Sequence, residues 1–244
     1  MYKRQDGARV VVHGRDRERA EAIAAKVGAA GVSIGDLSDL ANVEVVHAEA
    51  VAALGGPIEI LINNAGGSTT GNSMRSPIDT PVEDYVTNYR QNTLGAIRMC
   101  QLAVPDMTAA GFGRIVNVSS AVANQPNYMG ADYSAAKAAL LNFTFSLAGS
   151  LRGVGVTANV LTPGLVMVDG LLRAGRDMFG DPDMSIEEVT RRMAEADVFD
   201  IPPVGRLGTP RDLAFVACML ASPLSGFVTG ANYRVDGGMV RGLN

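Results

Sequence analysis

Short runs of apolar, largely β-branched residues alternate along this chain with longer stretches of helical periodicity. The strand-like runs lie at residues 8–12, 31–34, 58–62, 114–118, 156–160 and 233–235. The helical stretches lie at residues 16–27, 40–54, 82–110, 131–152 and 210–221. Strands that alternate with helices form βαβ units, in which the strands pair in parallel. We therefore predict an α/β fold with a doubly wound parallel sheet flanked by helices.

Composition limits the cellular setting and the partners. The 244 residues are 47% hydrophobic and 19% charged, which predicts one globular domain over residues 1–244. The sequence shows no apolar run of the roughly 20 residues that a membrane span needs and no secretory pattern at its start. We therefore expect a cytoplasmic protein without a membrane partner. A net charge of −4 with no extended basic cluster also argues against a nucleic-acid partner.

Three side chains indicate acid–base chemistry at a carbonyl group. Tyr133 and Lys137 are four residues apart in a predicted helix, so both project from one face. A cation close to a phenol lowers the tyrosine pKa from about 10 toward the working range of a general acid or base. Ser120 follows strand 114–118, at the sheet edge where α/β folds bind ligands, and its hydroxyl could hold a substrate oxygen beside Tyr133. The alternative is that Tyr133 and Lys137 simply lie on a helix surface, because this spacing alone arises often by chance.

Five motifs in order resemble the classical short-chain dehydrogenase/reductase family, from about Gly7 to Gly238. They are Asn63-Asn64-Ala65-Gly66, Asn92 within Tyr89-Arg-Gln-Asn-Thr93, Ser120 with Tyr133 and Lys137, Pro163-Gly164, and Val235-Asp236-Gly237-Gly238. The resemblance implies a Rossmann-type fold and an NAD(P)(H)-dependent oxidoreductase that interconverts a carbonyl and a secondary alcohol. It also implies a homotetramer, assembled through the helices around Asn92 and Tyr133, that acts on a small molecule.

The resemblance further implies a role for each site residue. Tyr133 would be the general acid/base, Ser120 would position the reacting oxygen, Lys137 would lower the tyrosine pKa, and Asn92 would hold a proton-relay water. An asparagine in a helix also often just bonds neighbouring backbone, which is the alternative for Asn92. The residues implied to contact the dinucleotide are Asn64, Ala65, Gly66, Tyr133, Lys137, Pro163, Gly164 and Val166.

Cofactor preference follows from the residues after the first strand-like run. NAD-binding folds place an acidic residue there, whereas a nearby arginine accommodates a 2′-phosphate. Here Arg15 stands at the strand end, which predicts NADP(H) in preference to NAD(H) unless Arg15 is a solvated surface residue. Asp36-Leu37 resembles the family's adenine-contacting pair, and a turn or N-cap aspartate is the alternative.

The start of the chain departs from the family pattern. The family opens with a strand and a TGxxxGxG loop that carries the pyrophosphate, and we expect this unit to be absent here. Because that strand is central in the family's order 3-2-1-4-5-6-7, its absence would leave a gap of roughly 10 Å between residues 8–12 and 58–62. Residues 1–5 do not fit the pattern that follows, and we expect them to be foreign, encoded by adaptor DNA. A natural pseudo-enzyme is the competing explanation.

Residues 169–203 are expected to form the variable substrate lid. Its apolar residues could line a pocket or could pack a helical hairpin on the body. They are Leu171, Leu172, Met178, Phe179, Met184, Met193 and Phe199. Two functions follow from the sequence: an NADP(H)-dependent oxidoreductase, or an inactive fragment or pseudo-enzyme subunit that cannot bind the dinucleotide.

Overall fold

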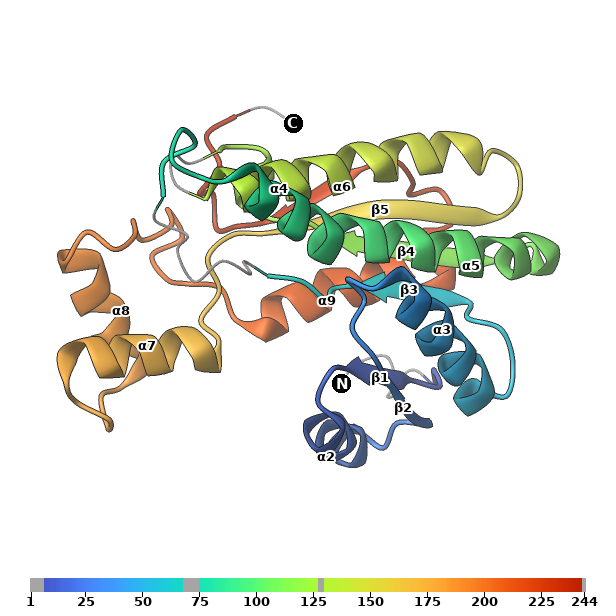
Figure 1. Cartoon of the computed structure of the whole chain (residues 1–244), viewed down its shortest axis with the longest axis horizontal. Coiled ribbons are helices and arrows are strands. Elements are labelled where there is room, and N and C mark those ends of the chain that lie inside the picture. The colour runs from blue at the N-terminus through green and yellow to red at the C-terminus, as the bar shows by residue number, and fades with distance from the viewer. Residues whose placement is uncertain (1–6, 68–74, 127–129, 243–244) are drawn as a thin grey trace.

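The computed structural model describes residues 7–67, 75–126 and 130–242, so residues 1–5 lie outside the described part. Within it, the strands form two parallel sheets (Figure 1). The first sheet has the order β1-β2, with β1 at Val11–Gly14 and β2 at Gly31–Ile34. The second has the order β3-β4-β5-β6, with bounds of Ile60–Asn63, Gly113–Val118, Val156–Pro163 and Asn232–Val235. The predicted α/β fold with parallel strands is confirmed, although several strand ends differ from the expected ranges.

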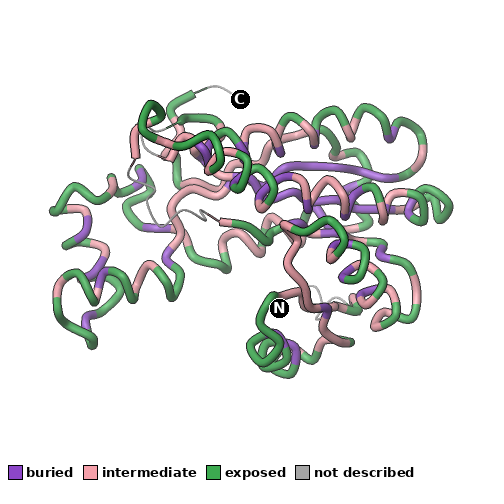
Figure 2. The backbone as a smooth tube through the Cα atoms, in the orientation of Figure 1, coloured by how far each residue is buried: buried purple, intermediate pink, exposed green. Residues whose placement is uncertain are grey.

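The central strands are buried on both faces, as their continuous apolar runs predict. Every residue of β4 is buried, and β5 is buried up to its last residue, as the purple tube in Figure 2 shows. Helices α3 (Leu40–Leu54), α5 (Gly95–Ala110) and α6 (Ala131–Ser150) supply one apolar layer with these strands. Helix α9 (Pro210–Ala221) packs on the opposite face, where Leu220 contacts the cluster around Val116. The parallel strands therefore end together at one edge of the sheet.

The edges of β1 and β3 lie on either side of one cavity in the part of the chain that the structure describes. In the described residues β1 pairs with β2 alone and β3 with β4 alone. A cavity of about 360 Å³ lies between these edges. Its wall includes Val10, Val11, Ile60 and Ile62, together with residues from α3 and α5. In the described residues, the edges of β1 and β3 that border this apolar cavity therefore form no strand-to-strand hydrogen bonds.

Local capping explains where the helices begin and end. Helix α2 (Arg17–Val27) begins where the Asp16 side chain accepts a hydrogen bond from the Arg19 backbone. It ends at Gly28, whose φ of 58° is left-handed and favours glycine. Gly28 is therefore the C-cap of α2 rather than part of a phosphate loop.

The stretch at residues 82–110 differs from the single helix expected. Helix α4 (Val82–Tyr89) passes into a five-residue π-helix, Arg90–Leu94, before α5 begins at Gly95. The apolar periodicity of residues 82–110 did not reveal this interruption, because a π-turn shifts the helical pattern by only one residue. Single π-turns often lie at functional sites, and this one carries Asn92.

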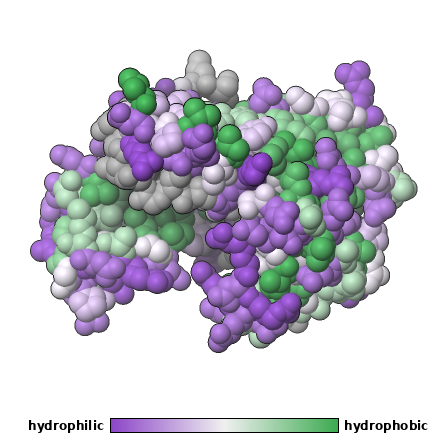
Figure 3. All heavy atoms as spheres, in the orientation of Figure 1, coloured by the Kyte–Doolittle hydropathy of each residue, from purple (hydrophilic) through white to green (hydrophobic). Residues whose placement is uncertain are grey.

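The expected lid contains helix α7 (Asp169–Phe179) and helix α8 (Ile186–Glu195), which stand apart from the sheet in Figure 1. Met184 and Met193 are buried in a cluster of this lobe's own, whereas Met178 is exposed. Most of the apolar residues named for the lid therefore pack the lobe itself. In Figure 3 other apolar groups lie on the lobe beside a hollow toward the body. No helix in the described ranges is long and apolar enough to cross a membrane.

Candidate functional site

Ser120, Tyr133 and Lys137 meet at the carboxyl end of β4. Ser120 follows this strand directly and precedes a short 3₁₀ turn, while Tyr133 and Lys137 come from the first two turns of α6. A side-chain hydrogen bond joins Ser120 to Tyr133. The Nζ atom of Lys137 lies 5.8 Å from the centre of the Tyr133 ring. The structure therefore brings the three residues together in the relation that their spacing predicts.

Lys137 is held inside the protein by backbone groups. Its side chain donates a hydrogen bond of 2.9 Å from Nζ to the carbonyl oxygen of Val118, the last residue of β4. Its own carbonyl accepts one from the Ser119 hydroxyl, also at 2.9 Å. Only 3% of Lys137 is exposed, and this burial lowers the lysine pKa to about 8. The ammonium group can therefore lose its proton near neutral pH.

The pKa of Tyr133 differs from the expectation. Burial raises it above its usual value, and the hydrogen bond with Ser120 opposes that rise. The expected lowering by Lys137 does not appear because the lysine ammonium is directed toward Val118. Ser120 is thus the group that favours the phenolate in this arrangement.

Asn92 bonds the loop after β3 through both ends of its amide. Its Oδ1 accepts a hydrogen bond of 2.8 Å from the Gly67 backbone amide, and its Nδ2 donates to the Gly67 carbonyl at 3.0 Å. Nδ2 also donates to the Asn88 carbonyl one turn earlier, at 3.1 Å. These are bonds to backbone groups, as in the alternative under which Asn92 only bonds neighbouring backbone. They also hold the loop that contains Asn64, Ala65 and Gly66.

Gly66 packs directly against the site. Its φ of 151° favours glycine. A Cβ atom at this position would lie 2.5 Å from Asn92 Oδ1 and 3.3 Å from Lys137 Nζ. Only a glycine lets the loop approach both side chains this closely. The motif Asn63-Asn64-Ala65-Gly66 therefore forms one continuous site with Asn92 and Lys137.

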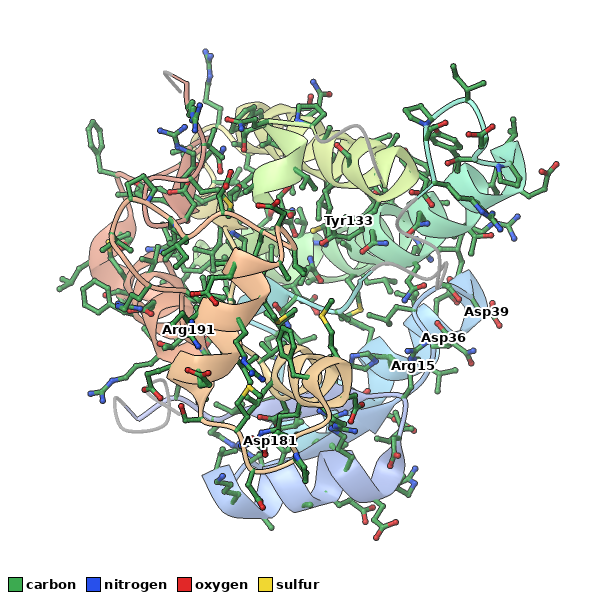
Figure 4. All side chains as sticks on the ribbon, turned by 90° about the vertical axis from the view of Figure 1, so that its left-hand side faces the viewer. Arg15, Asp36, Asp39, Tyr133, Asp181 and Arg191 are labelled. Carbon is green, nitrogen blue, oxygen red and sulfur yellow. The ribbon has the colours of Figure 1, made fainter. Side chains whose placement is uncertain are left out.

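A cavity of about 420 Å³ continues from this loop toward β1 and β2. Five of the expected cofactor residues line it together: Arg15, Asp36, Leu37, Ala65 and Gly66. Arg15 Nη1 lies 3.8 Å from Asp36 Oδ2. Figure 4 labels the two residues beside one another. The Ser38 backbone donates a hydrogen bond to Asp36, and this contact chiefly lowers the aspartate pKa. Asp36 is therefore both a turn aspartate and a cavity residue.

The fit of a dinucleotide to these residues is uneven. Arg15, Asp36 and Leu37 supply a cation, a carboxylate and an apolar contact, which suit a phosphorylated ribose and an adenine ring. A pyrophosphate is usually held by free amides at a helix N-terminus. The start of α2 lines this cavity, but the Asp16 carboxylate already caps it. The adenosine end of the cofactor therefore fits the described residues, whereas one of the α2 amides that could hold a pyrophosphate is already bonded to Asp16.

The remaining expected cofactor residues follow β5. Gly164 lies against the C-terminal motif, because a Cβ atom there would be 2.7 Å from Asp236 Cα. Val166 forms an isolated parallel bridge with Gly208. Pro163, Gly164 and Val166 are thus near the sheet edge but do not line the 420 Å³ cavity.

Sequence reasoning missed four residues around the site. Gln91 and His13 line both cavities, and the His13 ring contacts the Gly35 carbonyl at 3.0 Å. Asn88 and Asp132 are buried beside Asn92 and Tyr133. Gln91 and Asp132 could have been found from the sequence, because each directly precedes a predicted site residue. No motif in the sequence indicated His13. Among the described residues there is no group of three His, Cys, Asp or Glu side chains that could hold a metal ion.

Comparisons with known proteins identify the family of this chain. A family model described as enoyl-(acyl carrier protein) reductase matches residues 3–240. The inactive 2-(S)-hydroxypropyl-CoM dehydrogenase 2 of Xanthobacter autotrophicus is 36% identical, over 96% of this chain and 95% of that protein. The 3-oxoacyl-(acyl-carrier-protein) reductase of Haemophilus influenzae is 30% identical, over 96% and 88%. The structure of L-sorbose reductase from Gluconobacter frateurii, complexed with NADPH and L-sorbose, has a TM-score of 0.84 at 26% identity, over 97% and 88%.

These matches do not support the expected truncation, because the family model applies from residue 3 and the Xanthobacter protein is covered almost throughout. They cover all five motifs that carried the resemblance. The chain belongs to the classical short-chain dehydrogenase/reductase family of NAD(P)-dependent oxidoreductases.

Proposed function

We propose that this protein interconverts a carbonyl and a secondary alcohol on a small molecule, with Tyr133 as general acid/base and NADP(H) as cofactor. The observation that carries the proposal is the hydrogen bond between Ser120 and Tyr133 at the end of β4, with Lys137 beside them. When bound, the nicotinamide group supplies or accepts the hydride. The protein's own residues move the proton and hold the reacting oxygen.

Each residue has a defined task in this proposal. The Tyr133 hydroxyl gives a proton to the carbonyl oxygen in reduction and takes one from the alcohol in oxidation. Ser120 donates a hydrogen bond to the same oxygen and stabilises the charge that develops on it. Lys137, whose pKa burial lowers to about 8, lies 5.8 Å from the centre of the Tyr133 ring, so a bridging group would have to return the proton from it to Tyr133. Asn92 holds the Gly67 loop against the site.

The preference for NADP(H) rests on Arg15. Its exposed guanidinium lies at the mouth of the cavity, where it can bind a 2′-phosphate once the weak 3.8 Å contact with Asp36 is exchanged. A solvent-exposed ion pair is worth little, so this exchange costs little. The NADPH complex of the sorbose reductase, a structural neighbour, supports the same preference.

The homotetramer also belongs to this proposal. Large apolar side chains are exposed on two separate parts of the molecule, and burying both would require two different contacts between copies. One set lies on α4 and α6 and the other on or just after α9. They are Val82, Val86 and Phe145 in the first set, and Phe215, Leu224 and Phe227 in the second. Light scattering on the purified protein would measure the assembly directly.

An inactive subunit is the second candidate, and two observations favour it. The edges of β1 and β3 lack a ladder partner in the described residues and border an apolar cavity. The Xanthobacter relative also carries the word inactive in its name. In this alternative the protein retains Asn92, Ser120, Tyr133 and Lys137 but binds no dinucleotide.

One assay separates the two candidates. NADPH oxidation is followed by its near-ultraviolet absorbance with a panel of ketones, ketoses and 3-oxoacyl thioesters, for the wild type and for Tyr133→Phe. Turnover that Tyr133→Phe abolishes supports the oxidoreductase. If NADPH binds but no carbonyl is reduced, the acid–base proposal fails, and if NADPH does not bind, the inactive subunit is favoured.

A further inference from the structure

A buried carboxylate stands directly beside the general acid/base. Asp132 precedes Tyr133 in the first turn of α6, and only 3% of it is exposed. Its Oδ2 accepts a hydrogen bond of 2.7 Å from Nδ2 of Asn88, which is fully buried at the end of α4. Buried charges are costly unless they are paired or well hydrogen-bonded, so a carboxylate in this place requires an explanation.

The carboxylate fixes the orientation of the Asn88 amide. Nδ2 of Asn88 donates to the Asp132 carboxyl group, so the NH₂ group of Asn88 faces Asp132. The Asn88 oxygen then faces Asn92, whose Nδ2 donates to it at 3.4 Å and to the Asn88 carbonyl at 3.1 Å. A reversed Asn88 would set an oxygen against the carboxylate and two NH₂ groups against each other.

The chain of contacts reaches the loop at the cofactor cavity. Asn92 in turn hydrogen-bonds the Gly67 backbone through both the oxygen and the nitrogen of its side-chain amide. A second link lies one residue further on, where the Thr93 hydroxyl donates to the Ala136 carbonyl at 2.7 Å. Helix α4 and the π-helix are therefore tied to α6 on the two sides of Tyr133, through Asp132 and Ala136 respectively.

We propose that Asp132 and Asn88 are a positioning pair that holds Asn92 and the Gly67 loop in register with Tyr133. The proposal rests on the proposed function for its catalytic consequence, while the geometry itself can be tested without turnover. Neither residue touches the reacting atoms. Their effect passes through Asn92 on one side and through the start of α6 on the other.

Exchanging the partners tests the pair. Asn88→Asp sets two carboxylates against each other, which should lower kcat by about 10–100-fold while KM for NADPH changes by less than about threefold. The double variant Asn88→Asp with Asp132→Asn restores a donor and an acceptor in the reversed order, and it still offers Asn92 an acceptor. We expect it to recover kcat to within about threefold of the wild type. Asn88→Ala provides a second variant should Asn88→Asp fail to fold.

Thr144→Val is the matched structural control. Thr144 is a buried residue of the same helix, about three turns from Tyr133, and it hydrogen-bonds Asn117 at 2.9 Å. Its loss should lower the thermal midpoint without lowering kcat of the folded enzyme. If Asn88→Asp and Asn88→Ala also lower the thermal midpoint without lowering kcat, the pair is merely structural and the proposal is overturned.

A readout that needs no turnover separates this inference from the proposed function. Solvent exchange of the Asn92 side-chain NH₂ group is measured by NMR, with Asn92→Asp used to assign the resonances. Asn88→Asp or Asn88→Ala should accelerate this exchange at least about tenfold, and the double swap should slow it again. Unchanged exchange in the single variants overturns the positioning pair even if the enzyme is active. Faster exchange in an inactive protein supports the pair and rejects the proposed function alone.

Discussion

Lys137 donates from Nζ to the Val118 carbonyl at 2.9 Å, so its ammonium group is bound to the end of β4 rather than to the Tyr133 hydroxyl. The lysine therefore has two tasks. It anchors the start of α6 to the central sheet, and it holds a proton that burial makes easy to release, since its pKa is lowered to about 8.

Replacing Lys137 by methionine should reveal this pKa in the stability of the protein. The lysine pKa is about 8 in the folded protein and 10.5 for an ordinary lysine, so the unfolded chain binds more protons between these values. The free energy of unfolding of the wild type relative to Lys137→Met should therefore rise as the pH increases from 8 to 10.5, and this gain is lost as the pH falls back to 8. Urea unfolding across this range measures it. Lys26→Met, at an exposed lysine, should show no such dependence.

Replacing Tyr133 by phenylalanine should remove activity while leaving the fold intact. The ring keeps its packing and loses the hydroxyl that bonds Ser120. General acid–base catalysis contributes about 10²–10⁴-fold, so kcat should fall by that factor. Circular dichroism and the NADPH dissociation constant check the fold and the cofactor site. A variant that retains wild-type kcat would exclude Tyr133 as the acid/base.

Replacing Arg15 by leucine should weaken NADPH binding selectively. A hydrogen bond to a charged group is worth about 1.5–3 kcal/mol, so the NADPH dissociation constant should rise by about 10–100-fold. NADH lacks the 2′-phosphate, and its affinity should change little. Titration calorimetry measures both. The control is Arg17→Leu, since Arg17 is exposed and pairs with Glu21 on α2. Equal weakening of both cofactors would contradict the assignment of Arg15.

Adding a methyl group at Gly164 should destabilise the protein. A Cβ atom there would meet the Asp236 backbone at 2.7 Å, which requires the loops after β5 and β6 to separate. Overpacking of this kind costs about 1–3 kcal/mol in the free energy of unfolding. Gly170→Ala is the matched control because no atom lies within 4 Å of its Cβ position, in helix α7. Denaturant unfolding should separate the two variants.

The sequence was sufficient for the order of helices and strands and for the grouping of Ser120, Tyr133 and Lys137 at the end of β4. It was insufficient for features that depend on contacts between elements far apart in the chain. Residues 40–54 and 210–221 were predicted as helices with the bounds that α3 and α9 have, since apolar periodicity and caps are local signals. The π-helix at Asn92 and the Asp132–Asn88 bond were not foreseen, because both depend on how α4 packs on α6. The pKa of Tyr133 was expected to fall and instead rises, because spacing fixes neither burial nor the direction of a lysine side chain.

The most direct measurement is the thermal unfolding midpoint of the protein with and without NADPH. A ligand that binds only the folded state adds about 2.7 kcal/mol of stability at a hundredfold excess over its Kd. For a chain of this length that corresponds to a rise of about 5–10 °C, and we predict a larger rise with NADPH than with equimolar NADH. A midpoint that neither dinucleotide moves would contradict the account and favour the inactive subunit.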